Sequence, residues 1–319
     1  MFNNYLDFFT QTALIKAIAQ IPYIPGQLGS SGLFSVESLT GTQLAIEQQP
    51  DGGASIVTST ERGNPSKIET LDRRKVFTFN TSHYRVDGAV YADEVLNARA
   101  AGANAVGEVL ADRRNKTLAR MRRHIDLTLE QLRLTALLTG TTEFGSRPAE
   151  TTIAMGTDAT KTRAKIYTEI IEPIEAALGG IPYTDIRVWC SSGFWEGILG
   201  NKEIRDAYLY TANAQQLTGD TRMMVSYGGV TFERYRGSGT SVITANKAIA
   251  VPVGVADLFI EAYAPADTFS QVGAGALGSP YYVDSYPIDS GNRGFRLEIQ
   301  TNPVMICTRN DAIQLVGLT

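Results

Sequence analysis

Hydrophobic residues recur every three or four positions through the middle of the chain. The clearest stripe consists of Leu118, Met121, Ile125, Leu129, Leu132 and Ala136. This spacing places them on one face of an α-helix. Asp93 or Asn104 can cap its start, and Gly140 suits its end. From Asn104 to Leu138, at 1.5 Å per residue, the helix is about 50 Å long, so we expect it to run the length of the molecule.

The first third of the chain has a thinner hydrophobic pattern. A short helical pattern covers Phe8 to Ile21, and prolines and glycines then interrupt the chain. Residues 34–60 alternate weakly around a turn at Gln48–Gly53, and a further strand pattern occupies Lys75–Phe79. Because this segment has too few apolar residues for a core of its own, we expect an extended arm and a long hairpin. Their apolar side chains would then be buried on something else, such as a neighbouring subunit.

The second half alternates helical and strand patterns. Residues 161–178 have an amphipathic helical pattern in which Pro173 is expected to introduce a kink. A strand at 186–190 follows, and Ser192 is the expected cap of a helix that ends near Leu199. Further strand patterns occupy 225–236, 241–244, 248–255, 258–263, 295–300, 304–307 and 312–316. The chain of 319 residues is long enough for two lobes, and the pattern predicts an α+β or mixed α/β fold.

Composition narrows the class of protein. Hydrophobic residues make up 43% and charged residues 19%, with a net charge of −4. These values are ordinary for a soluble protein and give no general attraction to nucleic acid or anionic membranes. Cys190 and Cys307 lie in apolar runs and are predicted to be buried free thiols. Neither a secretory signal nor an apolar run of the ~20 residues that span a bilayer is present, so we expect folding in a reducing cytoplasm and no membrane partner.

Candidate chemistry is sparse. The two histidines, His83 and His124, have no second ligand at metal-binding spacing, so we predict neither a metal nor catalytic residues. Residues Gly273–Gly278 fit the glycine pattern of dinucleotide-binding loops. Pro280 and the aromatic residues after it argue against the helix that such a site needs, and we interpret the segment as a surface loop. We therefore predict no cofactor and no enzymatic activity.

Basic residues gather in two places. Arg73, Arg74 and Lys75 lie on the predicted hairpin, and the long helix carries Arg113, Arg114, Lys116, Arg120, Arg122 and Arg123. Acidic residues at helical spacing are Glu108, Asp112, Asp126 and Glu130, so a solvated face with internal ion pairs is one interpretation. The other is contact with an acidic neighbour or a phosphate backbone. Since no aromatic residues alternate with the arginines, contact with nucleic acid would be non-specific.

Several local sequences resemble a known family. They are Ile21–Gly29 with Gly32–Phe34, Thr60–Pro65, Phe79–Tyr84 with Ala92–Val95, Tyr263–Asp267, and Asn302–Arg309. In this order and spacing, the chain resembles the major capsid proteins of tailed bacteriophages, specifically the lambda major capsid protein E family, which has the Hong Kong 97-type fold.

The resemblance implies a division of the chain. The expected parts are an N-terminal arm at 1–50, an extended loop at 51–92, a peripheral domain at 93–183 with a spine helix at about 104–138 and completed by 283–302, an axial domain at 184–282, and C-terminal strands at 303–319 that return to the sheets. The implied function is self-assembly into pentamers and hexamers of an icosahedral shell around double-stranded DNA. Such a protein is found in the virion, and in the host cytoplasm before assembly.

The resemblance also implies partners and contacts. No long charged helical segment precedes the arm, so we expect a separate scaffolding protein, together with a portal, a possible decoration protein and non-specific contact with DNA. The expected intersubunit contacts are Arg62, Lys67, Arg73, Arg74, Phe77 and Phe79. The side chains expected to be buried mostly on neighbours are Phe34, Ile46, Ile56, Val57, Val76, Phe77 and Phe79. No partner asparagine is evident for Lys67, so we predict no crosslink.

Three alternatives remain at this level. An encapsulin-type compartment shares the fold without being viral. A soluble enzyme with an unrecognised site would form a small, defined oligomer. A tail or portal subunit would form tubes or rings.

Overall fold

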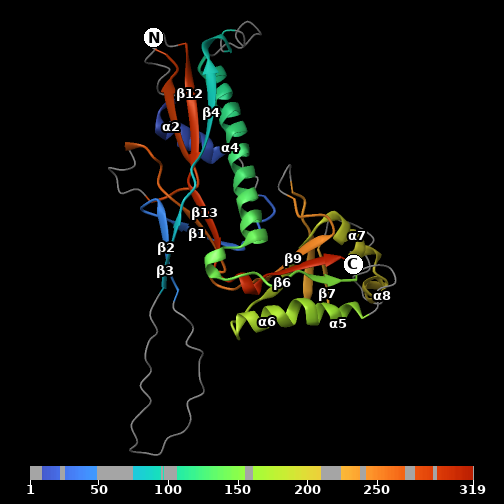
Figure 1. Cartoon of the computed structure of the whole chain (residues 1–319). Coiled ribbons are helices and arrows are strands. Elements are labelled where there is room, and N and C mark those ends of the chain that lie inside the picture. The colour runs from blue at the N-terminus through green and yellow to red at the C-terminus, as the bar shows by residue number, and fades with distance from the viewer. Residues whose placement is uncertain are drawn as a thin grey trace, which may run out of the picture.

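The long helix α4 organises the molecule. The computed structural model of the chain describes residues 9–21, 26–48, 75–94, 96, 106–154, 161–209, 224–237, 242–269, 277–289 and 293–318. Helix α4 (Val106–Thr139) stands beside a sheet at one end and meets a second lobe at the other, while a narrow hairpin projects on the side away from that lobe (Figure 1).

The prediction of one long helix is confirmed. It was expected at 104–138 and is observed at 106–139, with Leu118, Met121 and Ile125 buried. Gly140 follows it with φ +70°, and its N–H donates to Ala136 O at 3.0 Å. This left-handed residue ends the helix as expected. The candidate cap Asn104 lies outside the described residues.

A three-stranded antiparallel sheet lies along α4. Its strands are β11 (Tyr282–Pro287), β12 (Gly294–Thr301) and β4 (Tyr84–Tyr91), in that order. At Gly88 the approach of strand and helix is close, since a Cβ there would lie 2.6 Å from the Met121 sulfur. The arm helix α2 (Gln11–Gln20) packs into the same core through Leu14, Ala17 and Ile18. Strands β4 and β11 were not predicted as strands.

A second small sheet and the hairpin lie next to it. The sheet has the order β1 (Phe34–Ser38), β10 (Phe259–Tyr263) and β13 (Pro303–Cys307), with β1 parallel to β10. The hairpin pairs β2 (Gln43–Gln48) with β3 (Lys75–Asn80). Its inward-facing residues pack against this sheet and against Phe144 of the short helix η2 (Thr142–Phe144).

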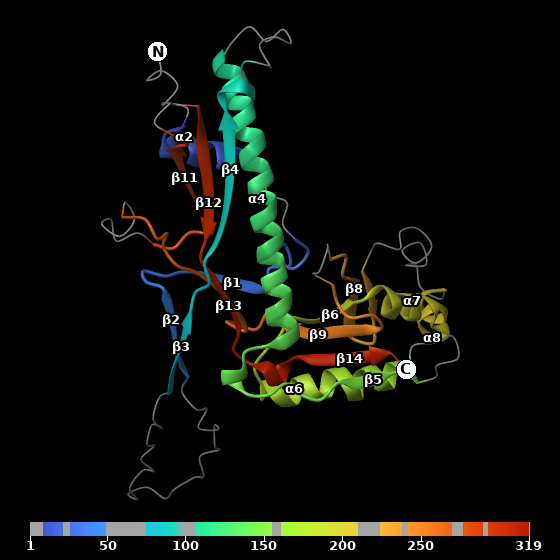
Figure 2. The same cartoon turned by 45° about the horizontal axis from the view of Figure 1, so that its top comes forward.

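The second lobe is built on a six-stranded mixed sheet. Its order is β5 (Thr151–Ile153), β14 (Gln314–Leu318), β9 (Lys247–Val253), β6 (Asp185–Cys190), β8 (Val230–Arg234) and β7 (Val225–Tyr227). The face with Val188 packs against helices, and the face with Trp189 packs against Leu134 and Leu137 of α4. Figure 2 shows the end of α4 beside this sheet. The helices of this lobe are α5 (Thr162–Ile166), the π-helix η3 (Tyr167–Ile171), α6 (Glu172–Leu178), α7 (Ser192–Gly200) and α8 (Lys202–Leu209). A short η4 (Asn310–Ala312) precedes β14.

Pro173 has the local effect expected of a helix interruption. It has no N–H to donate, and the preceding turn widens into the π-helix, in which the Glu172 N–H donates to Tyr167 O. The prediction that Ser192 caps α7 is wrong, because Ser191 holds the cap position. The Ser191 hydroxyl accepts from Lys247 N at 3.1 Å instead.

Two strand predictions need correction. The single strand expected at 225–236 is a hairpin, because Gly228 and Gly229 have φ of +68° and +89° and turn the chain. The strand expected at 241–244 is absent from the described residues 242–244. In addition, the helical run 162–178, expected with the spine helix, packs on the six-stranded sheet of the second lobe.

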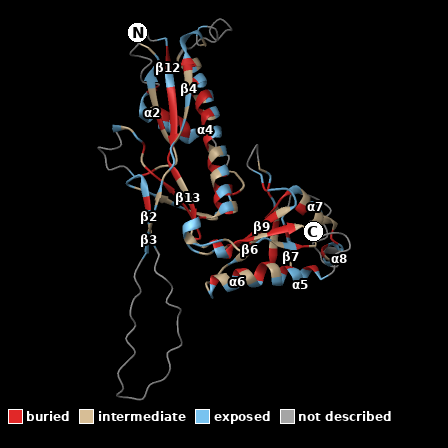
Figure 3. Ribbon diagram, in the orientation of Figure 1, coloured by how far each residue is buried: buried red, intermediate tan, exposed pale blue. Residues whose placement is uncertain are grey.

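The arm is buried against the rest of the chain more extensively than its composition indicates. Leu14 and Leu28 are fully buried within the chain, and Phe34 contacts Phe259 with ring centroids 5.1 Å apart. Figure 3 shows extensive burial along β12, which belongs to the core that the arm helix joins. Phe34 is half-buried within the chain, so burial of its remaining surface on a neighbouring subunit stays a prediction. The arm thus adds to cores that other segments begin.

Candidate functional site

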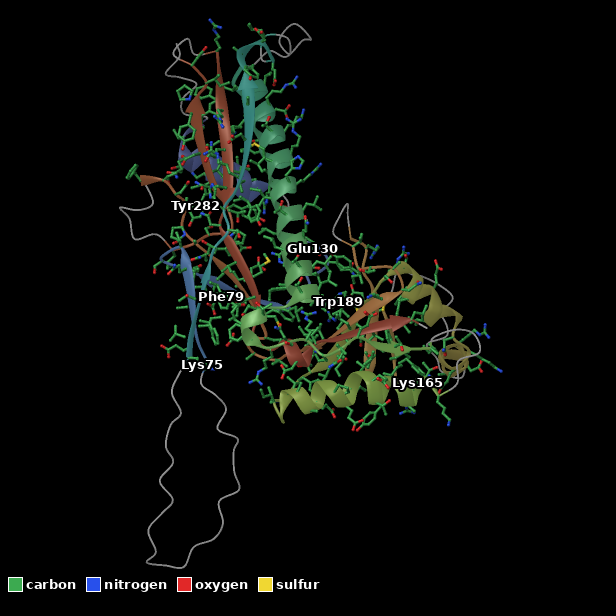
Figure 4. All side chains as sticks on the ribbon, in the orientation of Figure 1. Lys75, Phe79, Glu130, Lys165, Trp189 and Tyr282 are labelled. Atoms are coloured by element: carbon green, nitrogen blue, oxygen red, sulfur yellow. The ribbon has the colours of Figure 1, made fainter. Side chains whose placement is uncertain are left out.

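Glu130 of α4 anchors the arm in the core. Its carboxylate, in a residue 6% exposed, accepts hydrogen bonds from Leu28 N at 2.8 Å and Gly29 N at 3.2 Å (Figure 4). A Cβ at Gly26 would overlap this carboxylate, so only glycine allows the close approach. These contacts explain why the sequence at 25–29 has glycine at 26 and a backbone that faces Glu130 at 28 and 29. Pro25 lies outside the described residues.

Gln27 connects the same segment to the second lobe. Its Nε2 donates to Arg234 O at 2.8 Å and to Glu233 Oε1 at 2.5 Å, while its Oε1 accepts from Arg236 N at 2.9 Å. One side chain therefore supplies both a donor and an acceptor to the backbone that follows β8. Tyr235, between these residues, donates its hydroxyl to Glu130 at 3.3 Å. Burial, together with the negative charge of Glu130, raises the pKa of Tyr235.

A buried ion pair connects α4 to the small sheet. Arg133 donates to both oxygens of Glu261 on β10, at 2.8 and 2.7 Å, and both residues are buried. The Tyr263 hydroxyl also donates to Glu261, and burial followed by the charge of Glu261 raises the pKa of Tyr263. This two-pronged geometry fixes the relative position of helix and strand.

Arg122 holds the arm helix by its C-terminal end. Its Nη1 donates to the carbonyl oxygens of Ile18 and Ile21, at 2.6 and 2.8 Å, where the helix dipole favours a cation. Its guanidinium lies over the Tyr281 ring, 4.9 Å from the centroid, and Tyr281 donates to Asp126 at 2.5 Å. Burial raises the pKa of Asp126.

Asn302 joins three separate segments. Its Oδ1 accepts from His83 Nδ1 at 2.7 Å, and its Nδ2 donates to Pro265 O at 2.7 Å. Its backbone oxygen accepts from Ala264 N at 2.9 Å. The motifs that the sequence spreads over 79–84, 263–267 and 302–309 therefore meet here, and His83 has a structural hydrogen bond.

The described residues hold no metal-type cluster of three or more His, Cys, Asp or Glu side chains. Both cysteines are free and buried, and burial raises the pKa of Cys190 and that of Cys307, the latter to about 11. Residues 273–276 of the glycine-rich motif lie outside the described part, and no helix begins in the described 277–281. Instead, Gly278 N donates to Leu39 O at 2.8 Å.

The hairpin has two different faces. Leu44 and Phe79 are a cross-strand pair, as are Ile46 and Phe77. Phe77 and Phe79 are half-buried, and their ring centroids lie 5.1 and 5.7 Å from that of Phe144. Val76 faces the other way and is 57% exposed. Of the expected intersubunit residues, Arg62, Lys67, Arg73 and Arg74 lie outside the described residues, as do Ile56 and Val57.

A hollow of about 520 Å³ lies at the root of the hairpin. Its charged lining consists of Glu37, Glu47, Asp257, Asp311 and Arg309. A second acidic group lies on the sheet face turned away from α4, where Asp87, Glu298 and Asp284 stand opposite one another across three strands. Arg85 and Arg296 form ion pairs with Asp87 and Glu298 on the sheet face. The hollow at the hairpin root is therefore the more acidic of the two places.

Sequence reasoning missed the residues that join these segments. Glu130 and Arg133 were counted as surface charges or left out, because their positions lie beside the apolar stripe and not on it. The only signal was the conspicuous Gly26-Gln27-Leu28-Gly29 sequence, which indicated a constrained backbone but not its partner.

A long helix beside a sheet, a second lobe at its end and a projecting hairpin define a Hong Kong 97-like capsid subunit. Solved structures agree with this fold. A protein assigned as the capsid protein of a prophage in E. coli CFT073 is 14% identical, with a TM-score of 0.60 and coverage of 97% of this chain and 99% of that one. The mature capsid protein of bacteriophage PhiM1 is 13% identical with a TM-score of 0.53, and the match covers 93% of this chain and 88% of that one. The capsid protein of cyanophage P-SCSP1u is 10% identical with a TM-score of 0.56, and the match covers 93% of this chain and 90% of that one.

The chain belongs to the phage major capsid protein E family, whose sequence model matches residues 10–315. It is thus a structural shell protein of a phage virion that assembles with copies of itself. A search of curated protein sequences gives no significant match. In the described residues, no helix has both the length and the apolar character to cross a membrane.

Proposed function

We propose that this chain is the major head protein that forms pentamers and hexamers of an icosahedral shell enclosing double-stranded phage DNA. The observation that carries the proposal is the family match over 10–315, on a chain whose hairpin projects from the body. Many contacts per subunit, each modest by itself, make a closed symmetric shell cooperative.

The hairpin is the proposed main intersubunit element. It is a two-stranded sheet, so within the described residues each strand has one edge without a partner strand. Such edges accept a strand or side chains from a neighbouring chain. Val76 on its outward face is exposed, and Phe77 and Phe79 are only half-buried in the isolated subunit. All three can bury further area on a neighbour.

The basic residues of the same element are the proposed electrostatic contacts. Arg62, Lys67, Arg73 and Arg74 lie in the segment that connects β2 to β3. Their proposed partners are acidic groups of a neighbouring subunit. Both the hollow at the hairpin root and the row containing Asp284 offer such groups. We expect charge reversal at Arg73 and Arg74 to block shell formation and to leave the subunit folded.

The domain division is proposed with two refinements that the contacts support. The arm comprises 1–50 and the extended loop begins at 51, but residues 84–91 form β4 and belong with the peripheral sheet around α4. Residues 162–178 group with the axial lobe, whose sheet also receives the C-terminal strand β14.

Further partners are proposed from the class of protein. We expect a separate scaffolding protein and a portal to take part in assembly. A decoration protein is a further candidate partner, and the packaged DNA is expected to be contacted without sequence specificity. We propose no enzymatic activity, cofactor or covalent crosslink.

Negative-stain microscopy of the purified, overexpressed chain tests the proposal. Icosahedral shells, or pentamers and hexamers of capsomer size, are the expected result. A discrete dimer with enzymatic turnover would contradict it, and so would tubes or rings of tail or portal type. The contents of native particles distinguish a phage head from an encapsulin-type compartment. Packaged DNA would support the phage head, whereas protein cargo would support the compartment.

A further inference from the structure

One face of α4 carries a row of exposed cations. Arg113, Lys116, Arg120 and Arg123 are exposed and follow one another at intervals of three or four residues, which aligns them along the helix. Lys116 pairs with Asp112 at 2.7 Å. Among the described residues, no ion pair is formed by the three arginines.

The acidic residues that a self-neutralised helix face requires are used elsewhere. Glu130 points into the core and binds the arm backbone. Asp126 has a side chain only 10% exposed and contacts Arg122 and Tyr281. Glu108 is exposed and forms no ion pair with a described residue. Asp126 and Glu130 pair with the buried Arg122 and Arg133, so of these four carboxylates only Asp112 pairs with a cation of the exposed stripe. The stripe therefore keeps a net positive charge.

Two grooves accompany the stripe. The groove between α2 and α4, about 400 Å³, is lined by Lys116, Arg122 and Arg123 with Asp126 as its one carboxylate. The groove between α4 and the end of β4, about 250 Å³, is lined by Arg113, Lys116 and Arg120 with Glu94. Lys116 therefore stands on a ridge between two positively charged hollows.

The other side of the same layer carries charges of both signs. Strand alternation places Val86, Gly88 and Val90 toward α4, and Asp87 therefore points away from it. Asp87, Glu298 and Asp284 form a row across that outer face. Arg85 and Arg296 on that outer face form ion pairs with Asp87 and Glu298, so its charges largely compensate one another. The three arginines of the helix side form no ion pair with a described residue, and this side therefore suits a polyanion better.

We propose that the basic stripe of α4 contacts the phosphate backbone of the packaged double-stranded DNA, which places the helix side of the layer toward the shell interior. This inference rests on the proposed function. The stripe from Arg113 to Arg123 spans about 15 Å, which matches about four phosphates of one strand at 3.4 Å of axial rise each. It offers no aromatic side chain for base stacking, and apolar exposure on this face begins only at Leu127. A protein partner would need such anchors, whereas a phosphate backbone does not.

Binding of the unassembled full-length chain to a fluorescent 30-base-pair DNA of random sequence, followed by polarisation at several salt concentrations, tests the proposal. The variant is Arg113→Gln/Arg120→Gln/Arg123→Gln. The control, Arg163→Gln/Lys165→Gln/Lys202→Gln, removes the same charge from exposed positions on the second lobe. We expect the α4 variant to weaken binding at least about tenfold at low salt, and to reduce the salt slope by roughly two to three. The control should bind as the wild type does.

Equal affinity and salt slope for wild type and α4 variant would overturn the proposal. Tighter binding of the wild type to polyglutamate than to DNA would also overturn it and would indicate an acidic protein partner. Electron microscopy of the same samples tests shell formation separately from DNA binding. Shells formed by the α4 variant, together with lost DNA binding, support both proposals, whereas absence of shells from the wild type counts against the proposed function alone.

Discussion

The buried carboxylate of Glu130 accepts a hydrogen bond at 2.8 Å from the backbone N–H of Leu28, a residue that precedes it by 102 positions. This contact joins the arm to the middle of the long helix. Because the carboxylate also accepts from Gly29 and from Tyr235, one side chain holds together the arm, the helix and the second lobe.

Replacement of Glu130 by glutamine should therefore destabilise the subunit. The amide keeps one oxygen acceptor but turns an NH₂ group toward a backbone N–H. We expect a loss of about 1–3 kcal/mol in the free energy of unfolding, measured by urea denaturation of the unassembled chain. Glu108→Gln, at an exposed position of the same helix, is the control and should change stability little. Equal effects of the two substitutions would contradict the role of Glu130.

Gly26→Ala tests the close approach of the arm. The added methyl group overlaps the Glu130 carboxyl, and the required shift should cost about 1–3 kcal/mol. In a Glu130→Ala background the obstacle is gone, so the same substitution should cost much less. A double-mutant cycle of unfolding free energies measures this coupling, and a cost that is identical in both backgrounds would refute the overlap.

Leu14→Ala tests whether the arm helix belongs to the subunit core. Leu14 is 0% exposed and its neighbour Ile15 is 55% exposed. We expect Leu14→Ala to cost about 2–5 kcal/mol and Ile15→Ala to cost far less. Thermal unfolding of the unassembled chain compares them. If the two variants unfold at the same temperature, the arm is not packed as described.

Asp284→Asn should raise stability near neutral pH. Burial raises the pKa of Asp284 above its ordinary value of 3.8, so the folded state binds a proton more readily than the unfolded state. The cost of holding the charged form is then fully present above the folded pKa and disappears as the pH falls toward 3.8. Melting temperatures from pH 7 downward should show an advantage of the asparagine variant that shrinks with acidity. A constant difference at all pH values would contradict this cause.

Val76→Asp should prevent assembly without harm to the fold. Val76 is exposed on the outward face of the hairpin, so an aspartate there is harmless in the free subunit and becomes a buried charge in a contact. We expect shell yield, measured by sedimentation, to fall to about a tenth or less, since 1.4 kcal/mol corresponds to a tenfold change in an association constant. Val76→Thr keeps the shape and is the matched control. Normal shells from the aspartate variant would exclude this face from the interface.

The sequence predicted elements whose pattern is local. The stripe from Leu118 to Ala136 predicted the long helix, which ends at Thr139, one residue after the expected Leu138. The same reasoning failed at β4, where Gly88 and Asp87 break the alternation. Gly88 is needed for close packing on Met121, and Asp87 faces away from the helix beside charged neighbours. Both reasons depend on residues distant in the sequence.

The arm, and residues such as Glu130 that connect it to other segments, also could not be understood from local sequence patterns. Leu14 and Leu28 are too few to indicate a core, because each completes a cluster begun by another segment. Glu130 resembles an ordinary surface charge on a helix, and only its contact with the Leu28 backbone reveals its role. The family resemblance identified the right segments, but their physical purpose required the three-dimensional contacts.

Helix α4 has the length of a lever between the two ends of the molecule. At 34 residues it is about 50 Å long, so a rotation of about 5° at its Gly140 end moves the opposite end by about 4 Å. The end near Gly140 is packed on the six-stranded sheet, while the other end carries the peripheral sheet with it. In the proposed shell, a small angular difference between pentamer and hexamer positions would therefore become a displacement of several ångströms at the periphery.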